Sequence, residues 1–282
     1  MRTPEAVAAA GQLACLLEVS AAKPGNVSPE RHFHDTRYED FLASAVAIGP
    51  ALAAAGERPL GATIFAAVDA TTRWTSSNTN LGIILLLAPL ARAARHTTGP
   101  LRPAVREVLA STTVADAGDV YAAIRLADPG GLGSSDSEDV GAVPTVVLRE
   151  TMALAAERDS VAREYVTDFA TTFEIGAPAL RAARKDGLGW SDATVEAYLY
   201  LLAALPDTHI ARKLGREEAE AISRGAREAV TAGGVRSEAG HRALASLDRA
   251  LRDPANARNP GTTADLTCAA LFVVILEDGW NP

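Results

Sequence analysis

Residues 75–91 read TSSNTNLGIILLLAPLA, and this stretch sets the pattern that recurs along the chain. Small polar residues come first, and an almost unbroken apolar run from Leu81 to Ala91 follows, with Pro89 inside it. Ser, Thr and Asn side chains cap helices because they accept hydrogen bonds from the free N–H groups of the first turn. The stretch therefore predicts a buried helix over Asn78–Arg95 that begins at a polar, capped end.

Apolar residues recur at helical spacing along most of the 282 residues, and strand-like alternation is nearly absent. Alanine and leucine fill the apolar positions, which favours helix over strand. The predicted helices are Pro4–Ala21, Tyr38–Ala55, Leu60–Arg73, Asn78–Arg95, Leu101–Ser111, Val114–Leu126, Asp139–Ala156, Ser160–Ile175, Pro178–Lys185, Ser191–Leu205, Arg216–Thr231, Ser237–Leu251 and Thr262–Glu277. We therefore predict an all-α fold, a single domain of about a dozen helices over residues 1–282.

The composition limits the classes of function. A net charge of −8 and a pI of about 5.2 argue against a general basic surface for nucleic acids. The longest apolar runs, Leu81–Ala91 and Leu266–Leu276, cover about half of the ~20 residues that a membrane span needs. Cys15 and Cys268 lie in apolar runs without a CxxC pattern, which predicts buried, reduced thiols. We expect a cytoplasmic protein without nucleic-acid or membrane partners, and the apolar helices leave a homodimer interface open.

The first motif is Lys23-Pro24-Gly25-Asn26-Val27, which follows the first predicted helix directly. Pro24 disfavours helix at the preceding residue, and Pro-Gly suits a type II turn in which Gly25 has positive φ. The N–H groups of such a turn, together with the Lys23 ammonium and the Asn26 amide, suit an anion. The alternative is a plain helix stop with a solvated lysine.

The second motif is the polar start of residues 75–91. Asn78, Thr79 and Asn80 offer more side chains than one cap requires, and Gly82 allows close approach. The free N–H groups and partial positive charge of a helix N-terminus attract phosphate. The alternative is an ordinary cap on a core helix.

The third motif, residues 205–215, reads LPDTHIARKLG. Asp207 or Thr208 caps a short helix, which places His209, Arg212 and Lys213 at i, i+3 and i+4 on one face. This is the sharpest cluster of cations in an acidic chain. Polyphosphate binding explains it, and a solvated face at a helix C-terminus closed by Gly215 is the alternative.

The fourth motif is the turn Asn259-Pro260-Gly261, which precedes an apolar helix with Asp265 in its first turn. That carboxylate either stabilises the helix dipole or helps to hold Mg²⁺. Asp136 and Asp139, in a polar, Gly-rich loop, are further candidate Mg²⁺ ligands, and an acidic capping loop is the alternative. Neither a Walker A pattern nor a GxGxxG pattern after a strand occurs, so several helix N-termini are expected to converge on a phosphate-rich ligand.

The segments EVSAAKPGNV, NTNLGIILLLAPLA, DTHIARK and NPGTTADL, in this order, resemble the triphosphoribosyl-dephospho-CoA synthase family from about Gly11 to Glu277. The resemblance implies an all-α enzyme that uses ATP and 3′-dephospho-CoA. The 2′-hydroxyl of the acceptor attacks C1 of the ATP ribose, and adenine leaves. Tight positioning of the triphosphate, general-acid help to adenine and carboxylates near the ribosyl cation are expected.

The resemblance also implies roles for individual residues. The implied catalytic residues are Glu18, Asp207, His209 and Asp265. The implied ATP- and phosphate-binding residues are Lys23, Gly25, Asn26, Asn78, Thr79, Asn80, Arg212, Lys213, Asn259 and Gly261. Asp136 and Asp139 are candidates for Mg²⁺. As a phosphate clamp, Lys23 is expected to tolerate Lys23→Ala with little loss of stability but with a strong loss of ATP binding.

Two departures from the family pattern leave alternatives open. The family often has His-Lys where this chain has Asn80-Leu81, and a GxRGEAxxGFP-like middle segment is replaced by a different sequence. The chain is in this respect similar to archaeal and one-carbon-metabolism relatives. The alternatives are a different acceptor in one-carbon (pterin or furan) cofactor biosynthesis, a Mg²⁺-dependent helical hydrolase of ADP-ribose-like substrates, and a non-catalytic helical binding module. The binding module predicts no spatial clustering of Lys23, Asn78, Asp207 and Asp265.

Overall fold

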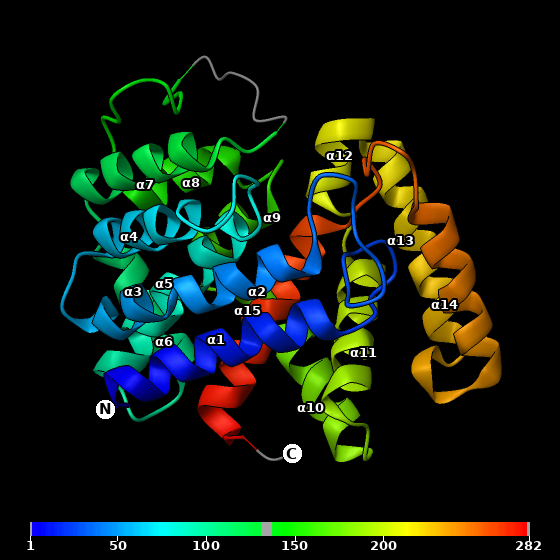
Figure 1. Cartoon of the computed structure of the whole chain (residues 1–282). Coiled ribbons are helices and arrows are strands. Elements are labelled where there is room, and N and C mark those ends of the chain that lie inside the picture. The colour runs from blue at the N-terminus through cyan, green and yellow to red at the C-terminus, as the bar shows by residue number, and fades with distance from the viewer. Residues whose placement is uncertain (1, 131–136, 281–282) are drawn as a thin grey trace.

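The computed structural model describes residues 2–130 and 137–280, and within these ranges the chain forms helices and no strand (Figure 1). The α-helices are α1 (Pro4–Ser20), α2 (Tyr38–Ala47), α3 (Gly49–Ala53), α4 (Leu60–Thr72), α5 (Leu81–His96), α6 (Leu101–Ala110), α7 (Val114–Ala127), α8 (Leu148–Ala155), α9 (Ser160–Val166), α10 (Ala177–Lys185), α11 (Trp190–Ala204), α12 (Thr208–Leu214), α13 (Arg216–Thr231), α14 (Glu238–Leu251) and α15 (Gly261–Asp278). The all-α prediction is confirmed. None of the described helices is both long enough and apolar enough to cross a bilayer.

Helices α1, α5 and α15 pack on one another at the centre of the molecule (Figure 1). Nearly all side chains of α5 and most of those of α15 are buried, which explains why their sequences are apolar on every face. Each fully buried Leu or Ile contributes about 1.5–3 kcal/mol relative to exposure. Cys15 and Cys268 lie between α1 and α15, buried and free, with their Sγ atoms 3.7 Å apart, as predicted for reduced thiols.

A second, smaller apolar core lies among α11, α12, α13 and α14, at one side of the bundle (Figure 1). Helix α11 contributes to both cores. Ala193 and Leu201 face the main core, whereas Tyr198 and Leu202 face the smaller one. This shared helix supports one domain over residues 1–282, which stays a prediction.

The predicted helix Ser160–Ile175 is interrupted: α9 ends at Val166, and the chain is helical again from Ala170 through the π-helical residues Thr172–Gly176. Asp168 has a left-handed backbone (φ 53°), which ends the helical run after α9. The buried Glu164 carboxylate accepts hydrogen bonds from the N–H groups of Thr171 and Thr172 at 2.9 Å each and from the Thr172 hydroxyl at 2.6 Å. These hydrogen bonds pair the free N–H groups at the start of a π-helical turn, Thr172–Gly176, which leads into α10. The chain therefore turns at a point where the local sequence favours a continuous helix.

Two further predicted helices have different bounds. The predicted helix Tyr38–Ala55 is split into α2 and α3 at Gly49-Pro50, because proline lacks the N–H that a continuous helix requires. The predicted helix Asp139–Ala156 begins only at Leu148, since Pro144 disfavours helix before it. The other predicted helices agree with the structure to within a few residues at each end.

Candidate functional site

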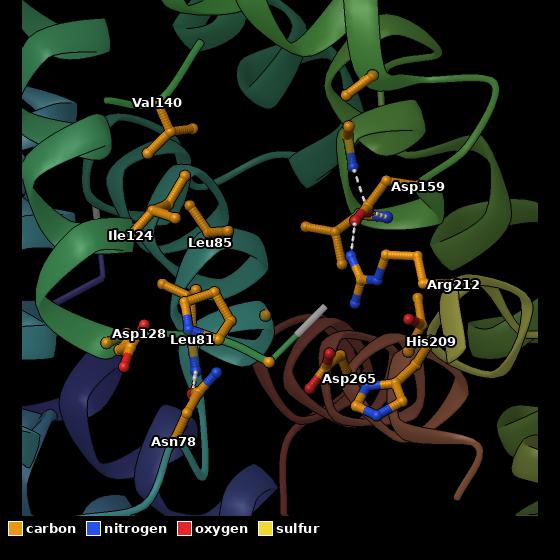
Figure 2. Close-up of a pocket in the computed structure, with 18 of the residues that line it drawn as sticks. Asn78, Leu81, Leu85, Ile124, Asp128, Val140, Asp159, His209, Arg212 and Asp265 are labelled. Atoms are coloured by element: carbon orange, nitrogen blue, oxygen red, sulfur yellow. Dashed lines mark hydrogen bonds and ion pairs between the residues drawn. The ribbon is translucent and has the colours of Figure 1, made fainter. Parts of the chain in front are cut away.

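Two adjoining hollows lie where α5, α12 and α15 begin. The larger, the main cavity, has a volume of ≈ 630 Å³ and is drawn in Figure 2. The smaller, the inner recess, has a volume of ≈ 120 Å³. The residues that line both are Phe33, Phe41, Asn78, Leu81, Gly82, His209, Asn259 and Asp265. Hollows of this combined size are typical of small-molecule sites.

All four sequence motifs contribute to the inner recess. The contributing motif residues are Glu18 and Asn26, then Asn78, Thr79, Asn80 and Gly82, then His209, then Asn259, Gly261 and Asp265. The predicted convergence of these helix ends therefore occurs. It is the opposite of what a helical module without a common site predicts.

Asp265 is the fifth residue of α15, just past the first turn in which it was expected, and it faces both hollows. A Cβ on Gly82 would overlap Oδ2 of Asp265 and lie 2.6 Å from its Cγ, so only glycine lets the carboxyl lie against the backbone of α5. Within residues 2–130 and 137–280, no side chain or backbone group donates a hydrogen bond to this carboxyl. Burial, with the negative charges of Glu18 and Asp207, raises the pKa of Asp265 well above its usual value. The carboxyl is therefore biased toward its protonated form.

Glu18 lines the inner recess from the last turn of α1, and Lys23 lies behind it. The Lys23 ammonium is buried and lies 2.9 Å from Glu18 Oε1. It also donates to the backbone carbonyls of Glu18 and Ala21, the second at 3.3 Å. Lys23 lines neither hollow, contrary to the expectation of a solvent-facing phosphate clamp. A buried cation needs a counter-charge and hydrogen-bond acceptors, and the last turn of α1 supplies them through the carboxylate and the carbonyl of Glu18.

The turn after Lys23 has the predicted geometry but not the predicted free donors. Gly25 has φ 79°, and the Asn26 N–H donates to the Lys23 carbonyl at 3.2 Å, as a type II turn requires. The Gly25 N–H donates to Asp248 Oδ1 at 2.8 Å, so neither N–H is open to an anion. The Asn26 amide donates to Asn259 Oδ1 at 3.1 Å, which ties the first motif to the fourth.

In the second motif, Ser76, Ser77 and Asn78 line the main cavity, whereas Thr79 and Asn80 do not. Asn78 Oδ1 accepts the Leu81 N–H at 3.1 Å and so caps α5 while its side chain remains exposed. The Thr79 hydroxyl hydrogen-bonds inward to Ser44, and the Asn80 amide donates inward to another buried hydroxyl. Thr79 and Asn80 therefore support the start of α5 from beneath.

Asp207 lines neither hollow, although the resemblance implied a catalytic role. Its Oδ1 accepts the N–H groups of His209 and Ile210, which caps α12, as predicted. Its Oδ2 accepts both the N–H and the hydroxyl of Thr263 at 2.7 Å each. Burial raises the pKa of Asp207, and the hydrogen bonds from Thr263 oppose that shift. The carboxyl thus fixes the start of α12 against α15.

His209 faces both hollows from the first turn of α12. Its Nε2 is buried and has no hydrogen-bond partner among the described residues. Burial lowers the pKa of His209 to about 4, and the charges of Lys213 and Arg212 act in the same direction. The ring is therefore neutral at pH 7, so it does not share the positive charge of its two helix neighbours.

The cations of the third motif lie on the wall of the main cavity. Arg212 pairs with Asp159 Oδ2 at 2.7 Å, and Asp159 Oδ1 caps α9 (Figure 2). Lys213 and Arg158 also line the main cavity. None of these three cations lines the inner recess. Positive charge is thus confined to the larger hollow.

The wall of the main cavity opposite Arg212 and His209 is largely apolar, although Asn78 and Asp128 also lie on it (Figure 2), and the sequence did not reveal this apolar lining. Figure 2 shows His209, Arg212 and Asp265 on one side and Ile124 and Val140 on the other. The apolar lining comes mainly from α5, α7, α8 and α9 and comprises Leu81, Leu85, Val120, Ile124, Leu126, Val140, Met152, Leu154, Ala155, Val161 and Ala162. The main cavity therefore has a charged side and an apolar side.

The predicted metal ligands do not form a site in the described part of the chain. Asp136 lies outside the described residues. Asp139 Oδ1 accepts the Gly141 N–H at 2.8 Å, and the residue lines neither hollow. No cluster of three potential ligand side chains occurs in residues 2–130 and 137–280.

Sequence reasoning missed the two aromatic side chains, Phe33 and Phe41, that line both hollows. Their signal was a pair of aromatic residues in an otherwise polar segment directly after the first motif. It also missed Asp159, because the neighbouring Ser160 was predicted to cap α9. Both residue types are good N-caps, and the sequence could not choose between them.

Comparisons with known proteins agree on one family. The family model described as ATP:dephospho-CoA triphosphoribosyl transferase matches residues 4–282. A protein of Pseudomonas syringae pv. syringae is 32% identical over 151 residues, which are 50% of this chain and 51% of that protein. A protein of Pseudomonas paraeruginosa is 40% identical over 98 residues, 35% of this chain and 33% of that protein. Both carry the name probable 2-(5''-triphosphoribosyl)-3'-dephosphocoenzyme-A synthase, and the aligned chain spans about half or less of their length.

A solved structure from Archaeoglobus fulgidus has a similar fold. It is described as a putative triphosphoribosyl-dephospho-CoA synthase, and it matches with a TM-score of 0.67 and 33% sequence identity. The match covers 85% of this chain and 100% of that one. The names of these three proteins refer neither to a one-carbon cofactor acceptor nor to a hydrolase, so the comparisons do not favour either alternative.

Proposed function

Because this chain belongs to the ATP:dephospho-CoA triphosphoribosyl transferase family, we propose that it transfers the 5-triphosphoribosyl group of ATP to the 2′-hydroxyl of 3′-dephospho-CoA. The acceptor O2′ forms a bond to C1 of the ribose, and the bond from C1 to N9 of adenine breaks. The hydroxyl gives up a proton, and adenine takes one up as it leaves. The triphosphate remains intact, so the reaction needs no Walker-type phosphate loop.

The observation that carries this proposal is the convergence of all four motifs around Asp265. Adenine is a poor leaving group, and a proton delivered to one of its ring nitrogens makes it a better one. A carboxyl with a raised pKa supplies that proton at neutral pH, typically for a rate gain of about 10²–10⁴-fold. Asp265 is therefore the proposed general acid.

Glu18 is the proposed counter-charge to the ribosyl cation that develops at C1. It lines the same recess as Asp265, and its negative charge is one cause of the raised pKa of Asp265. Two carboxyl groups with different environments commonly divide such roles between acid and electrostatic stabiliser. Lys23, held 2.9 Å from Glu18 Oε1, acts as a positioning residue that fixes this carboxylate.

The triphosphate is proposed to lie in the main cavity beside Arg158, Arg212 and Lys213. The N-terminus of α5, beside Asn78, adds partial positive charge on the same anion. Mg²⁺ enters this proposal as part of the substrate MgATP, in which phosphate oxygens and water supply most ligands. This agrees with the lack of a three-ligand cluster in the described ranges.

The apolar wall of the main cavity suits the pantetheine arm of the acceptor. That arm is long and carries no charge, and the wall from Ile124 to Met152 and Leu154 offers apolar contact along it. We also propose that the protein is cytoplasmic, where ATP is supplied. It is proposed to form a homodimer and to have no nucleic-acid partner.

The test is product analysis of purified protein incubated with MgATP, with and without 3′-dephospho-CoA. We expect free adenine only when the acceptor is present. Mass spectrometry should show an equal amount of a product that retains all three phosphates of ATP. An acceptor that lacks the 2′-hydroxyl is the matched control and should release none. ADP or inorganic phosphate in place of adenine would overturn the proposal.

A further inference from the structure

We propose that the inner recess is the binding site of the leaving adenine and that His209 Nε2 hydrogen-bonds the base there. The inference rests on the proposed function, in which adenine is the leaving group. It goes further because it assigns one of the two hollows, and one side chain, to one part of the substrate.

The buried nitrogen of His209 is the first observation. Nε2 is excluded from solvent, and no described residue contributes a hydrogen-bond partner to it. Buried polar atoms in folded proteins almost always have a partner, because an unpaired one is unfavourable. His209 lines the recess, and because Nε2 itself has almost no accessible surface, a rotation of the ring brings it to a ligand there that supplies the missing partner.

The charge of the recess is the second observation. No described lysine or arginine lines it, and the Glu18 carboxylate disfavours a phosphate there, while the protonated Asp265 carboxyl adds no positive charge. The main cavity instead has Arg212 and Lys213 on its wall. A nucleotide that spans both hollows therefore places its phosphates in the main cavity and its uncharged base in the recess.

The remaining chemistry of the recess also fits a purine. Phe33 and Phe41 supply aromatic rings. Because Asn26 Nδ2 donates to Asn259 Oδ1 and to the Tyr198 hydroxyl, the Asn26 carbonyl oxygen and the Asn259 NH2 are the acceptor and donor offered to a base. Burial keeps the imidazole of His209 neutral, with its pKa at about 4, so it pairs with a neutral heterocycle. Aromatic rings with a few uncharged polar groups are what a planar base requires.

The position of Asp265 completes the geometry. It lines both hollows, so a base in the recess and a triphosphate in the main cavity place C1 of the ribose at their junction. The carboxyl then lies beside the base that must take up the proton. The reverse placement, with the phosphates in the recess, would separate them from Arg212 and Lys213 and set them against the Glu18 carboxylate.

A crossed binding experiment tests the inference without any catalysis. Free adenine and inorganic tripolyphosphate are titrated by calorimetry into the wild type, His209→Phe, Lys213→Met and the control His241→Phe, which changes an exposed histidine of α14. We expect His209→Phe to raise the Kd of adenine about tenfold and that of tripolyphosphate less than twofold. Lys213→Met should show the reverse pattern, and His241→Phe neither.

A second variant keeps the test decisive if His209→Phe is poorly folded. Phe33→Leu, in a loop, should weaken adenine several-fold through lost ring contact and leave tripolyphosphate unchanged. Unchanged adenine affinity in both variants, or an equal loss for both ligands, would overturn the inference. If the crossed pattern holds but no acceptor-dependent adenine release occurs, the proposed function fails and the recess assignment stands. If release occurs without the crossed pattern, only the recess assignment fails.

Discussion

Replacing Lys23 by methionine distinguishes between two roles of Lys23: partner of Glu18 in a buried ion pair, or solvent-facing phosphate clamp. Methionine retains the apolar stem of lysine and removes only the ammonium group. In the structure, the Lys23 side chain has 0% exposure and the paired Glu18 side chain 5%. The change therefore leaves the Glu18 carboxylate buried without its counter-charge.

The magnitude follows from that burial. Removing one partner of a buried ion pair costs about 3–5 kcal/mol. Two backbone carbonyls, of Glu18 and Ala21, also lose a donor, at about 1 kcal/mol each when no water replaces it. We expect Lys23→Met to lower the free energy of unfolding by about 5–7 kcal/mol, a large share of the roughly 5–15 kcal/mol typical of a folded protein.

The assay is urea unfolding at pH 7.5 in a double-mutant cycle of Lys23→Met, Glu18→Gln and the pair. Because the double variant leaves no unpaired charge, it should lose about 2 kcal/mol less than the sum of the single losses. Lys185→Met, on the exposed surface of α10, is the control and should change stability by less than about 0.5 kcal/mol. If Lys23→Met costs under about 1 kcal/mol and ATP binding collapses, the clamp is correct and the structural role of the ion pair is not.

Three further outcomes are expected. Gly82→Ala should lower kcat about tenfold or more, because the added Cβ displaces the Asp265 carboxyl, whereas Gly118→Ala, with open space around its Cβ, should leave kcat unchanged. The pKa of His209 is lower in the folded than in the unfolded protein, so stability falls as the pH drops from 6.5 toward about 4. The free energy of unfolding, measured with urea, should fall on the order of 2 kcal/mol over this range, and His209→Phe should remove this loss. Leu154→Gln, at a half-exposed position of the apolar wall, should raise KM several-fold for 3′-dephospho-CoA but not for ADP, the acceptor without its arm.

The helices were predictable where the information is local. Polar residues followed by apolar runs, at residues 75–81 and 259–266, indicate from the local sequence where α5 and α15 begin, although the carboxylate that accepts the Thr263 N–H of α15 is the distant Asp207. The break at Asp168 was not predictable. It depends on Arg106 and Arg149, distant in sequence, which pair with the Asp168 carboxylate. Long-range charge pairs of this kind leave no periodic trace in the sequence.

The candidate site shows the same division. The repeated pattern of a polar turn before a buried helix predicted that the four motifs meet, and they do. The direction of Lys23 was not predictable, because α14 covers the turn, with Asp248 taking the Gly25 N–H and Leu251 packing on the glycine. The apolar wall and the neutral state of His209 likewise arise from tertiary burial.

The most direct measurement is the single-turnover rate of adenine release by Asp265→Asn, with MgATP and 3′-dephospho-CoA, beside the wild type. Asparagine retains the size of the carboxyl but cannot donate the proton of a carboxylic acid. We expect the rate to fall about 10²–10⁴-fold while the Kd for ATP changes little. A rate within a few-fold of the wild type would show that Asp265 is not the acid and that the chemistry takes place elsewhere.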